Sequence, residues 1–166
     1  MNSSRPWFCS LPVLAALLAA VGCSSNDDSA AVTVPSPHSA ITKLCRNLDK
    51  ALPRTVDGLG RRDPTPASAL TAGWGNPVVI LRCGVSRPPK MIDPDVANGK
   101  DPDAVAGGVN GVDWLMEKQD DGSNRFTTAN RETYVEIRVP GDQDSSTVLV
   151  DLAAAIKKTI PEGIAD

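Results

Sequence analysis

The best candidates for a binding site in this chain are six polar and aromatic residues: Trp74, Arg82, Asp113, Trp114, Tyr134 and Glu136. Guanidinium, carboxylate and aromatic groups together can hold a peptide, a glycan or another protein. Because side chains alternate along a β-strand, Tyr134 and Glu136 share one face of their strand. If Arg82 lies on the same face of the sheet, it pairs with Glu136 in a shallow groove with aromatic walls. The alternative is a surface ion pair beside core tryptophans.

Groups that could carry out catalysis are sparse. His38 is the only histidine, and it lies in or at the end of a polar linker. A single histidine removes the usual His-based metal clusters, and it removes Ser-His-Asp arrangements unless this one residue serves in one. The chain contains no HExxH, GxSxG, Walker or GxGxxG motif. Asp113 with Glu136 or Glu117 could act as an acid–base pair, but any surface sheet offers such pairs. We therefore expect no cofactor and favour a non-enzymatic protein.

The acidic stretch 93–103 invites comparison with a calcium loop. An EF-hand that begins at Asp93 needs an oxygen ligand at its fifth position and a glutamate at its twelfth. Ala97 and Ala104 stand at these positions. We therefore predict a solvated acidic loop without a bound metal.

The first residues have the pattern of an export leader. Residues 1–22 begin with a positive charge and continue with an uncharged apolar stretch that is too short to span a bilayer. Small residues then precede Cys23, as in a bacterial lipobox. We predict that Cys23 is acylated and anchors the protein to the extracytoplasmic face of the cell membrane. The alternative is an ordinary signal peptide that is cleaved nearby.

The remaining cysteines predict a disulfide. The chain has four cysteines; Cys9 leaves with the leader and Cys23 carries lipid. Cys45 lies on the apolar face of a predicted helix, and Cys83 has the inward register of a predicted strand. An exported protein enters an oxidising compartment, where such a pair forms and persists. The alternative is two buried free thiols.

The chain divides into a signal peptide (1–22), a lipidated flexible tether (23–38) and one domain (39–166). The tether is rich in Ser, Asn, Asp, Ala and Pro, which is typical of disordered linkers. The formal net charge of −3 argues against a nucleic-acid partner. The expected partners are the membrane, through Cys23, and an envelope protein or the cell wall.

Hydrophobic periodicity predicts the elements of the domain. A spacing of three and four residues favours a helix over 39–52, and another helix runs from Ser145 or Ser146 to about Thr159. Thr65-Pro66 starts a short helix over 66–72. Apolar runs and alternation predict strands at 77–84, 109–117, 125–128 and 132–139, with the first in the centre of the sheet. The predicted fold class is α+β, a four-stranded antiparallel sheet with two or three helices packed on one face.

Several segments are similar to one known family. They are Cys45…Leu52-Pro53…Val56-Asp-Gly58, Pro66-Ala-Ser-Ala69…Trp74-Gly75, Leu81-Arg-Cys-Gly-Val85, Gly111-Val-Asp-Trp114, Phe126-Thr-Thr128 and Tyr134-Val-Glu136. Over about 45–158 the chain resembles the domain-of-unknown-function 3515 family of actinobacterial lipoproteins. The resemblance implies a small, exported, lipid-anchored envelope protein with Cys45 and Cys83 paired, and it implies no activity. The function expected is that of a binding or accessory lipoprotein; the alternatives are a cell-wall hydrolase and a purely structural surface lipoprotein.

Overall fold

The computed structural model of the chain describes residues 31–76 and 79–165. The predicted signal peptide and Cys23 lie outside the described residues. The helices are α1 (Ser39–Ala51), α2 (Pro94–Ala97) and α3 (Ser145–Thr159), with a 3₁₀ turn η1 (Pro89–Ile92). The strands are β1 (Thr55–Val56), β2 (Leu59–Gly60), β3 (Thr71–Trp74), β4 (Val79–Val85), β5 (Ala104–Val109), β6 (Val112–Lys118), β7 (Asn124–Ala129) and β8 (Tyr134–Val139).

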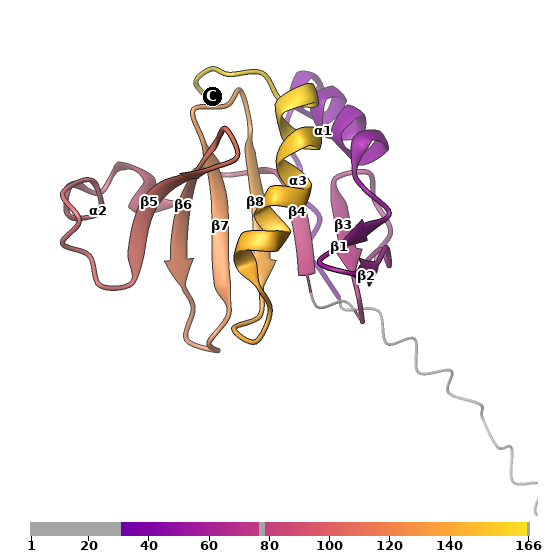
Figure 1. Cartoon of the computed structure of the whole chain (residues 1–166). Helices are drawn as coiled ribbons and strands as arrows, with labels where there is room; N and C mark the ends of the chain where they lie inside the picture. Colours follow the sequence, from indigo (N-terminus) through magenta and orange to yellow (C-terminus); the bar gives the residue numbers. More distant parts are fainter. Residues whose placement is uncertain (1–30, 77–78, 166) are drawn as a thin grey trace, which may run out of the picture.

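The main sheet has six antiparallel strands in the order β3-β4-β8-β7-β6-β5, and β1 and β2 form a separate hairpin (Figure 1). The prediction of a four-stranded sheet is therefore wrong, although the α+β class holds. The two strands of the main sheet that were not predicted, β3 and β5, form its two edges. Strand β4, expected in the centre, is second in the order and pairs with β3 and β8.

One face of the sheet packs on helices α1 and α3 and forms the main core. Alternate residues of β8, such as Val135 and Ile137, are fully buried there against Leu152 and Ile156 of α3. This alternation is the one that the sequence predicted for the fourth strand, and it leaves Tyr134 and Glu136 on the opposite face.

The opposite face is partly covered by the segment that contains η1 and α2. Val96 of α2 packs with Ala104 and Leu115 in a second small core, with Met91 against it. Because Leu115 follows Trp114 of the main core, the two residues point to opposite sides of β6. The helices are therefore not all on one face: α1 and α3 cover one side and α2 the other.

The expected helix over 66–72 is absent. Instead, Ser68 makes a turn in which its hydroxyl accepts from the Leu70 N–H at 3.1 Å and its carbonyl from the Thr71 N–H at 3.1 Å. Thr71 then opens β3, whose four residues pair with β4 from Thr71–Arg82 to Trp74–Val79. The ladder with β4 satisfies the backbone of this segment, so tertiary pairing overrides the local helix signal.

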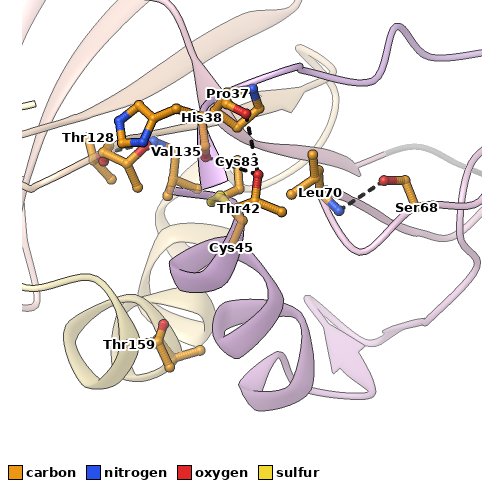
Figure 2. The surroundings of a disulfide bond; sticks show 12 residues. Pro37, His38, Thr42, Cys45, Ser68, Leu70, Cys83, Thr128, Val135 and Thr159 are labelled. Atoms are coloured by element: carbon orange, nitrogen blue, oxygen red, sulfur yellow. Dashed lines mark hydrogen bonds between the residues drawn. A yellow bond between two sulfur atoms is a disulfide. The ribbon is translucent and has the colours of Figure 1, made fainter. Parts of the chain in front are cut away.

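A disulfide joins Cys45 of α1 to Cys83 of β4, with a Cα–Cα distance of 5.6 Å (Figure 2). Both side chains are 1% exposed. The predicted pairing is confirmed, and it ties the first helix to the sheet within the core.

Residues 31–38, which we call the strap, lie against the folded body. The Val32 N–H donates to the Thr65 carbonyl at 2.9 Å. At the other end of the strap, the Thr42 hydroxyl of α1 is directed to the carbonyls of Pro37 and His38, at 3.4 and 3.1 Å (Figure 2). The strap, which is the described part of the expected tether, thus makes hydrogen bonds near its beginning, at Val32, and near its end, at Pro37 and His38.

Candidate functional site

A groove of about 430 Å³ opens where the strap meets the ends of β4 and β8. The strap forms one wall with residues 35–38. The sheet forms the other wall with Arg82, Tyr134 and Glu136, on the face away from α1 and α3. The structure therefore brings together three of the six residues that the sequence proposed as a binding surface.

Arg82 and Glu136, which both line this groove, form an ion pair. They stand opposite each other in the β4–β8 ladder, and Arg82 Nη1 donates to Glu136 Oε1 at 3.0 Å. The side chains are 30% and 14% exposed, so the pair is partly open to solvent. The predicted pairing is confirmed, and it leaves a guanidinium and a carboxylate within reach of a polar ligand.

The two tryptophans do not reach the groove. Trp74 is fully buried; its Nε1 donates to the Pro53 carbonyl at 3.1 Å, and Arg61 lies over its ring at 5.4 Å. Trp114 is 3% exposed and meets Phe126 edge-on, with ring centroids 6.5 Å apart. Both rings are core side chains, and the aromatic wall of the groove is Tyr134 alone among the described residues.

Asp113 also lies elsewhere, on β6 beside the β7–β8 turn. Its Oδ2 accepts from Asn130 Nδ2 at 3.0 Å. The two side chains line a second hollow of about 380 Å³, which is distinct from the groove. The six proposed residues therefore do not form one surface.

Several groove residues were not identified from the sequence, because they belong to the strap or lie just outside the ends of β4 and β8. His38 and Ser36 come from the strap, and Ser86 and Glu132 from the ends of β4 and β8. His38 is the only histidine of the chain, and that was the one available signal. These residues add an imidazole, two hydroxyls and a second carboxylate to the groove.

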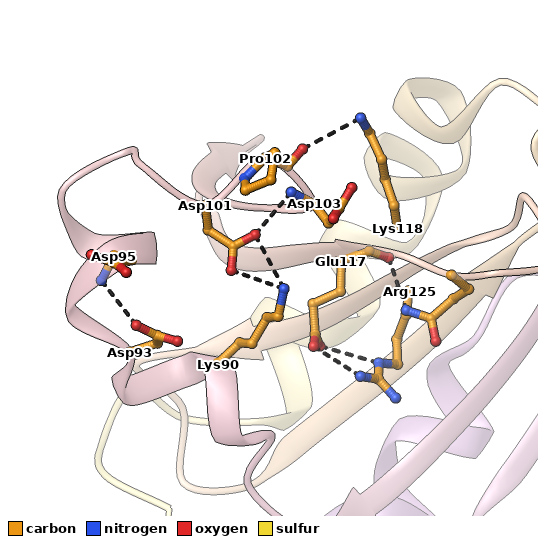
Figure 3. Close-up of polar contacts among 10 residues, drawn as sticks. Lys90, Asp93, Asp95, Asp101, Pro102, Asp103, Glu117, Lys118 and Arg125 are labelled. Carbon is orange, nitrogen blue, oxygen red and sulfur yellow. Dashed lines mark hydrogen bonds and ion pairs between the residues drawn. The ribbon is translucent and has the colours of Figure 1, made fainter.

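Two of the four carboxylates in the acidic stretch 93–103, those of Asp93 and Asp101, make contacts within the fold (Figure 3). Asp101 pairs with Lys90 at 2.8 Å and accepts from the Asp103 N–H at 2.8 Å. The hydrogen bond from Lys90 lowers the pKa of the Asp101 carboxyl. Asp93 caps α2 by accepting from the Asp95 N–H. Within 31–76 and 79–165, no group of three or more His, Cys, Asp or Glu residues could hold a metal ion.

Glu117, considered as an acid–base group, is paired with Arg125 (Figure 3). Arg125 donates to both carboxylate oxygens, through Nη2 at 2.8 Å and Nε at 3.1 Å. Glu117 is only 4% exposed. This bidentate pair across β6 and β7 is a structural contact of the sheet.

Gly84 positions the strap wall of the groove. It has φ +82° at the register shift between Cys83 and Val85, and a Cβ there would stand 2.6 Å from Pro37 Cγ. We expect Gly84→Ala to cost at least about 1–2 kcal/mol in unfolding free energy, because a left-handed conformation penalises a side chain. It should also displace Pro37, which limited proteolysis of the strap would detect.

Gly60→Ala is the matched control for this prediction. Gly60 has no left-handed φ, and an added Cβ would have nothing within 4 Å. Denaturant titration should show little change for Gly60→Ala. Equal stability and equal strap cleavage for both variants would contradict the role of Gly84.

None of the helices within 31–76 and 79–165 has the length and apolar character needed to cross a membrane.

Comparison with known proteins gives one family. The profile of the family described as Protein of unknown function (DUF3515) matches residues 8–165, which is nearly the whole chain. Searches of curated proteins and of solved structures found no significant match.

Proposed function

We propose that this chain, which belongs to the domain-of-unknown-function 3515 family, is a lipid-anchored envelope protein that binds a polar ligand in the groove beside its strap. It acts as a binding or accessory protein and does not turn its ligand over. The observation that carries the proposal is that one wall of the groove, residues 35–38, belongs to the segment that leads from Cys23.

The proposed anchor keeps the groove close to the membrane. Ala31, where the described strap begins, is the eighth residue after Cys23, and an extended chain of eight residues spans at most roughly 26–29 Å. Two or more acyl chains on Cys23 would anchor the protein stably, since a single chain gives only marginal binding. The ligand would therefore be met near the outer surface of the cell membrane.

The side chains of the groove support a polar ligand that carries both charge signs. Arg82 can bind a carboxylate or phosphate, while Glu136 and Glu132 can bind an ammonium group. Tyr134 offers an aromatic ring and a hydroxyl. Cell-wall fragments, which combine sugars with short peptides, match this mixture, and so does an extended segment of an envelope protein.

Lipid anchoring is tested by replacing the acylated residue. Cys23→Ser should prevent labelling by a radioactive fatty acid and should release the protein from the membrane fraction or leave an uncleaved precursor. Cys9→Ser is the control and should be labelled like the wild type. A Cys23→Ser protein that is still acylated and membrane-bound would overturn the anchor.

Ligand binding is tested with soluble cell-wall fragments and thermal unfolding, because a ligand of the folded state raises Tm. Arg82→Ala and Glu136→Gln should each abolish the rise in Tm while lowering stability by no more than about 1 kcal/mol, since the pair is partly exposed. Arg138→Ala is the control, because Arg138 lies on the same strand but pairs with Asp121, outside the groove.

The outcome separates three functions. A rise in Tm that is lost only in the groove variants supports binding at the groove. An equal rise in all variants would overturn the groove as the site. Turnover of the fragments would support the cell-wall hydrolase, and no response to fragments or to envelope proteins would support the structural lipoprotein.

A further inference from the structure

Strand β5 is an edge of the main sheet, and α2 lies beside its first residue, Ala104 (Figure 1). Residues 105–108 are all exposed, although they pair with β6 on one side. The strand reads Ala-Val-Ala-Gly-Gly-Val and contains no charge, proline or bulge. Soluble proteins usually protect an edge by such devices, because an unprotected edge is a template for another strand.

The backbone groups that point outward follow from the hydrogen-bond pattern. The Lys118 N–H donates to the Asp103 carbonyl at 2.8 Å, so Asp103 bonds toward β6. In an antiparallel ladder this direction alternates. Val105, Gly107 and Val109 therefore bond toward β6, whereas Ala106 and Gly108 direct their N–H and C=O groups away from the sheet.

We propose that β5 is a homodimer interface, at which it pairs antiparallel with β5 of a second copy across a two-fold axis at Gly107. In this register Ala106 of each copy exchanges hydrogen bonds with Gly108 of the other. Gly107 meets Gly107, and each Val105 meets Val109. Val105, which is 48% exposed in the single chain, is covered by this contact.

Charge complementarity at the two ends of the strand favours a second copy over an unrelated peptide. The same register places Asp103 opposite Gly111 of the second copy. Lys157 of α3 lies beside that turn: its Nζ donates to the Asn110 carbonyl at 2.7 Å and would stand 3.4 Å from a Cβ on Gly111. Asp103 and Lys157 are both exposed. The two-fold axis therefore brings each Asp103 carboxylate to a Lys157 ammonium group, twice per dimer.

The faces of the two copies also match. Asp103, Val105 and Gly107 alternate with Ala104, which packs with α2, so they point to the side of the sheet that carries α3. A two-fold axis perpendicular to the sheet keeps that side common to both copies. The short length of the contact predicts a weak dimer that depends on protein concentration.

Cross-linking tests the register directly. The full chain is used in detergent solution, with Cys9 and Cys23 replaced by serine so that no other free thiol is present. Gly107→Cys should give a disulfide-linked dimer under mild oxidation, because two residues directly opposite in a non-hydrogen-bonded pair lie about 4.5 Å apart. An added Cβ at Gly107 has nothing within 4 Å, so the fold should tolerate it.

Val105→Cys is the matched control, because its nearest counterpart in the second copy is Val109, not itself. It should remain monomeric alone and should cross-link when mixed with Val109→Cys. Dimers from Val105→Cys alone that equal those from Gly107→Cys would contradict this register. The absence of any Gly107→Cys dimer at high protein concentration would overturn the interface.

A charge exchange tests the choice of partner. Asp103→Lys and Lys157→Asp should each reduce the yield of the Gly107→Cys dimer several-fold, and the double variant should restore it. Circular dichroism of each variant shows whether it is folded. Reduced yields that the double variant does not restore, in folded proteins, would contradict the pairing of Asp103 with Lys157.

Discussion

Replacing Cys45 and Cys83 together by serine should lower the free energy of unfolding by about 4 kcal/mol. The disulfide closes a loop with a sequence separation of 38, and the chain-entropy relation gives a figure of this size for such a loop. The loss is a large part of the 5–15 kcal/mol typical of a whole domain. Denaturant titration of the oxidised wild type and of the double variant measures the difference.

Reduction of the wild-type protein provides an internal comparison. Wild type in reducing agent should unfold near the midpoint of the double variant, and Cys9→Ser should match the oxidised wild type because Cys9 takes no part in the bond. A double variant with the stability of the oxidised wild type would contradict the stabilising role of the disulfide. Two alkylatable thiols at Cys45 and Cys83 in protein isolated from cells would contradict the bond itself.

Arg131→Met should destabilise the fold by about 3–5 kcal/mol. Arg131 is 5% exposed and donates to two backbone carbonyls, Ile160 at 3.1 Å and Gly111 at 2.9 Å. It thereby joins the end of α3 and the β5–β6 turn to the chain before β8. Hydrogen bonds from a charged group contribute about 1.5–3 kcal/mol each, and their loss leaves the two carbonyls without this donor.

Arg138→Met is the matched control for Arg131→Met. Arg138 is 51% exposed and pairs with Asp121, which is also exposed, so we expect a change within about 1 kcal/mol. Thermal unfolding of both variants gives the comparison. Equal, small losses would show that Arg131 does not hold these three segments together.

The parts of the fold that sequence reasoning predicted well are those with long periodic patterns. Helices α1 and α3 carry apolar residues at helical spacing, and β8 alternates cleanly over Thr133–Val139. These signals depend on burial against one large core. The disulfide followed from the same patterns, since they put both cysteines on inward positions.

The missed elements are short and depend on tertiary pairing. Strand β5 is rich in glycine and alanine and has no alternation, so only its ladder with β6 identifies it. The β1–β2 hairpin had a local signal, Asp57-Gly58, and both residues have positive φ. Asn110-Gly111 carries the same turn signal between β5 and β6. These two residues were nevertheless predicted to lie inside one strand, 109–117.

Only part of the candidate site was predicted, because strand alternation can be recognised in the sequence whereas contacts between distant segments cannot. Alternation and pairing placed Arg82, Tyr134 and Glu136 on one face correctly. Trp74 and Trp114 went to the core because large aromatic side chains contribute most when they are buried. The strap wall could not be predicted, since its polar, proline-containing sequence resembles a flexible linker and its contacts are with Thr65 and Gly84, which are distant in sequence.

Backbone-amide NMR of the protein titrated with soluble cell-wall fragments tests most directly that the groove is the binding site. We predict concentration-dependent shifts at His38 of the strap and at Arg82, Tyr134 and Glu136 of the sheet, with β5 unaffected. Arg82→Ala should remove these shifts, and Arg138→Ala should keep them. Shifts confined to other surfaces, or the same shifts in Arg82→Ala, would contradict the proposed function.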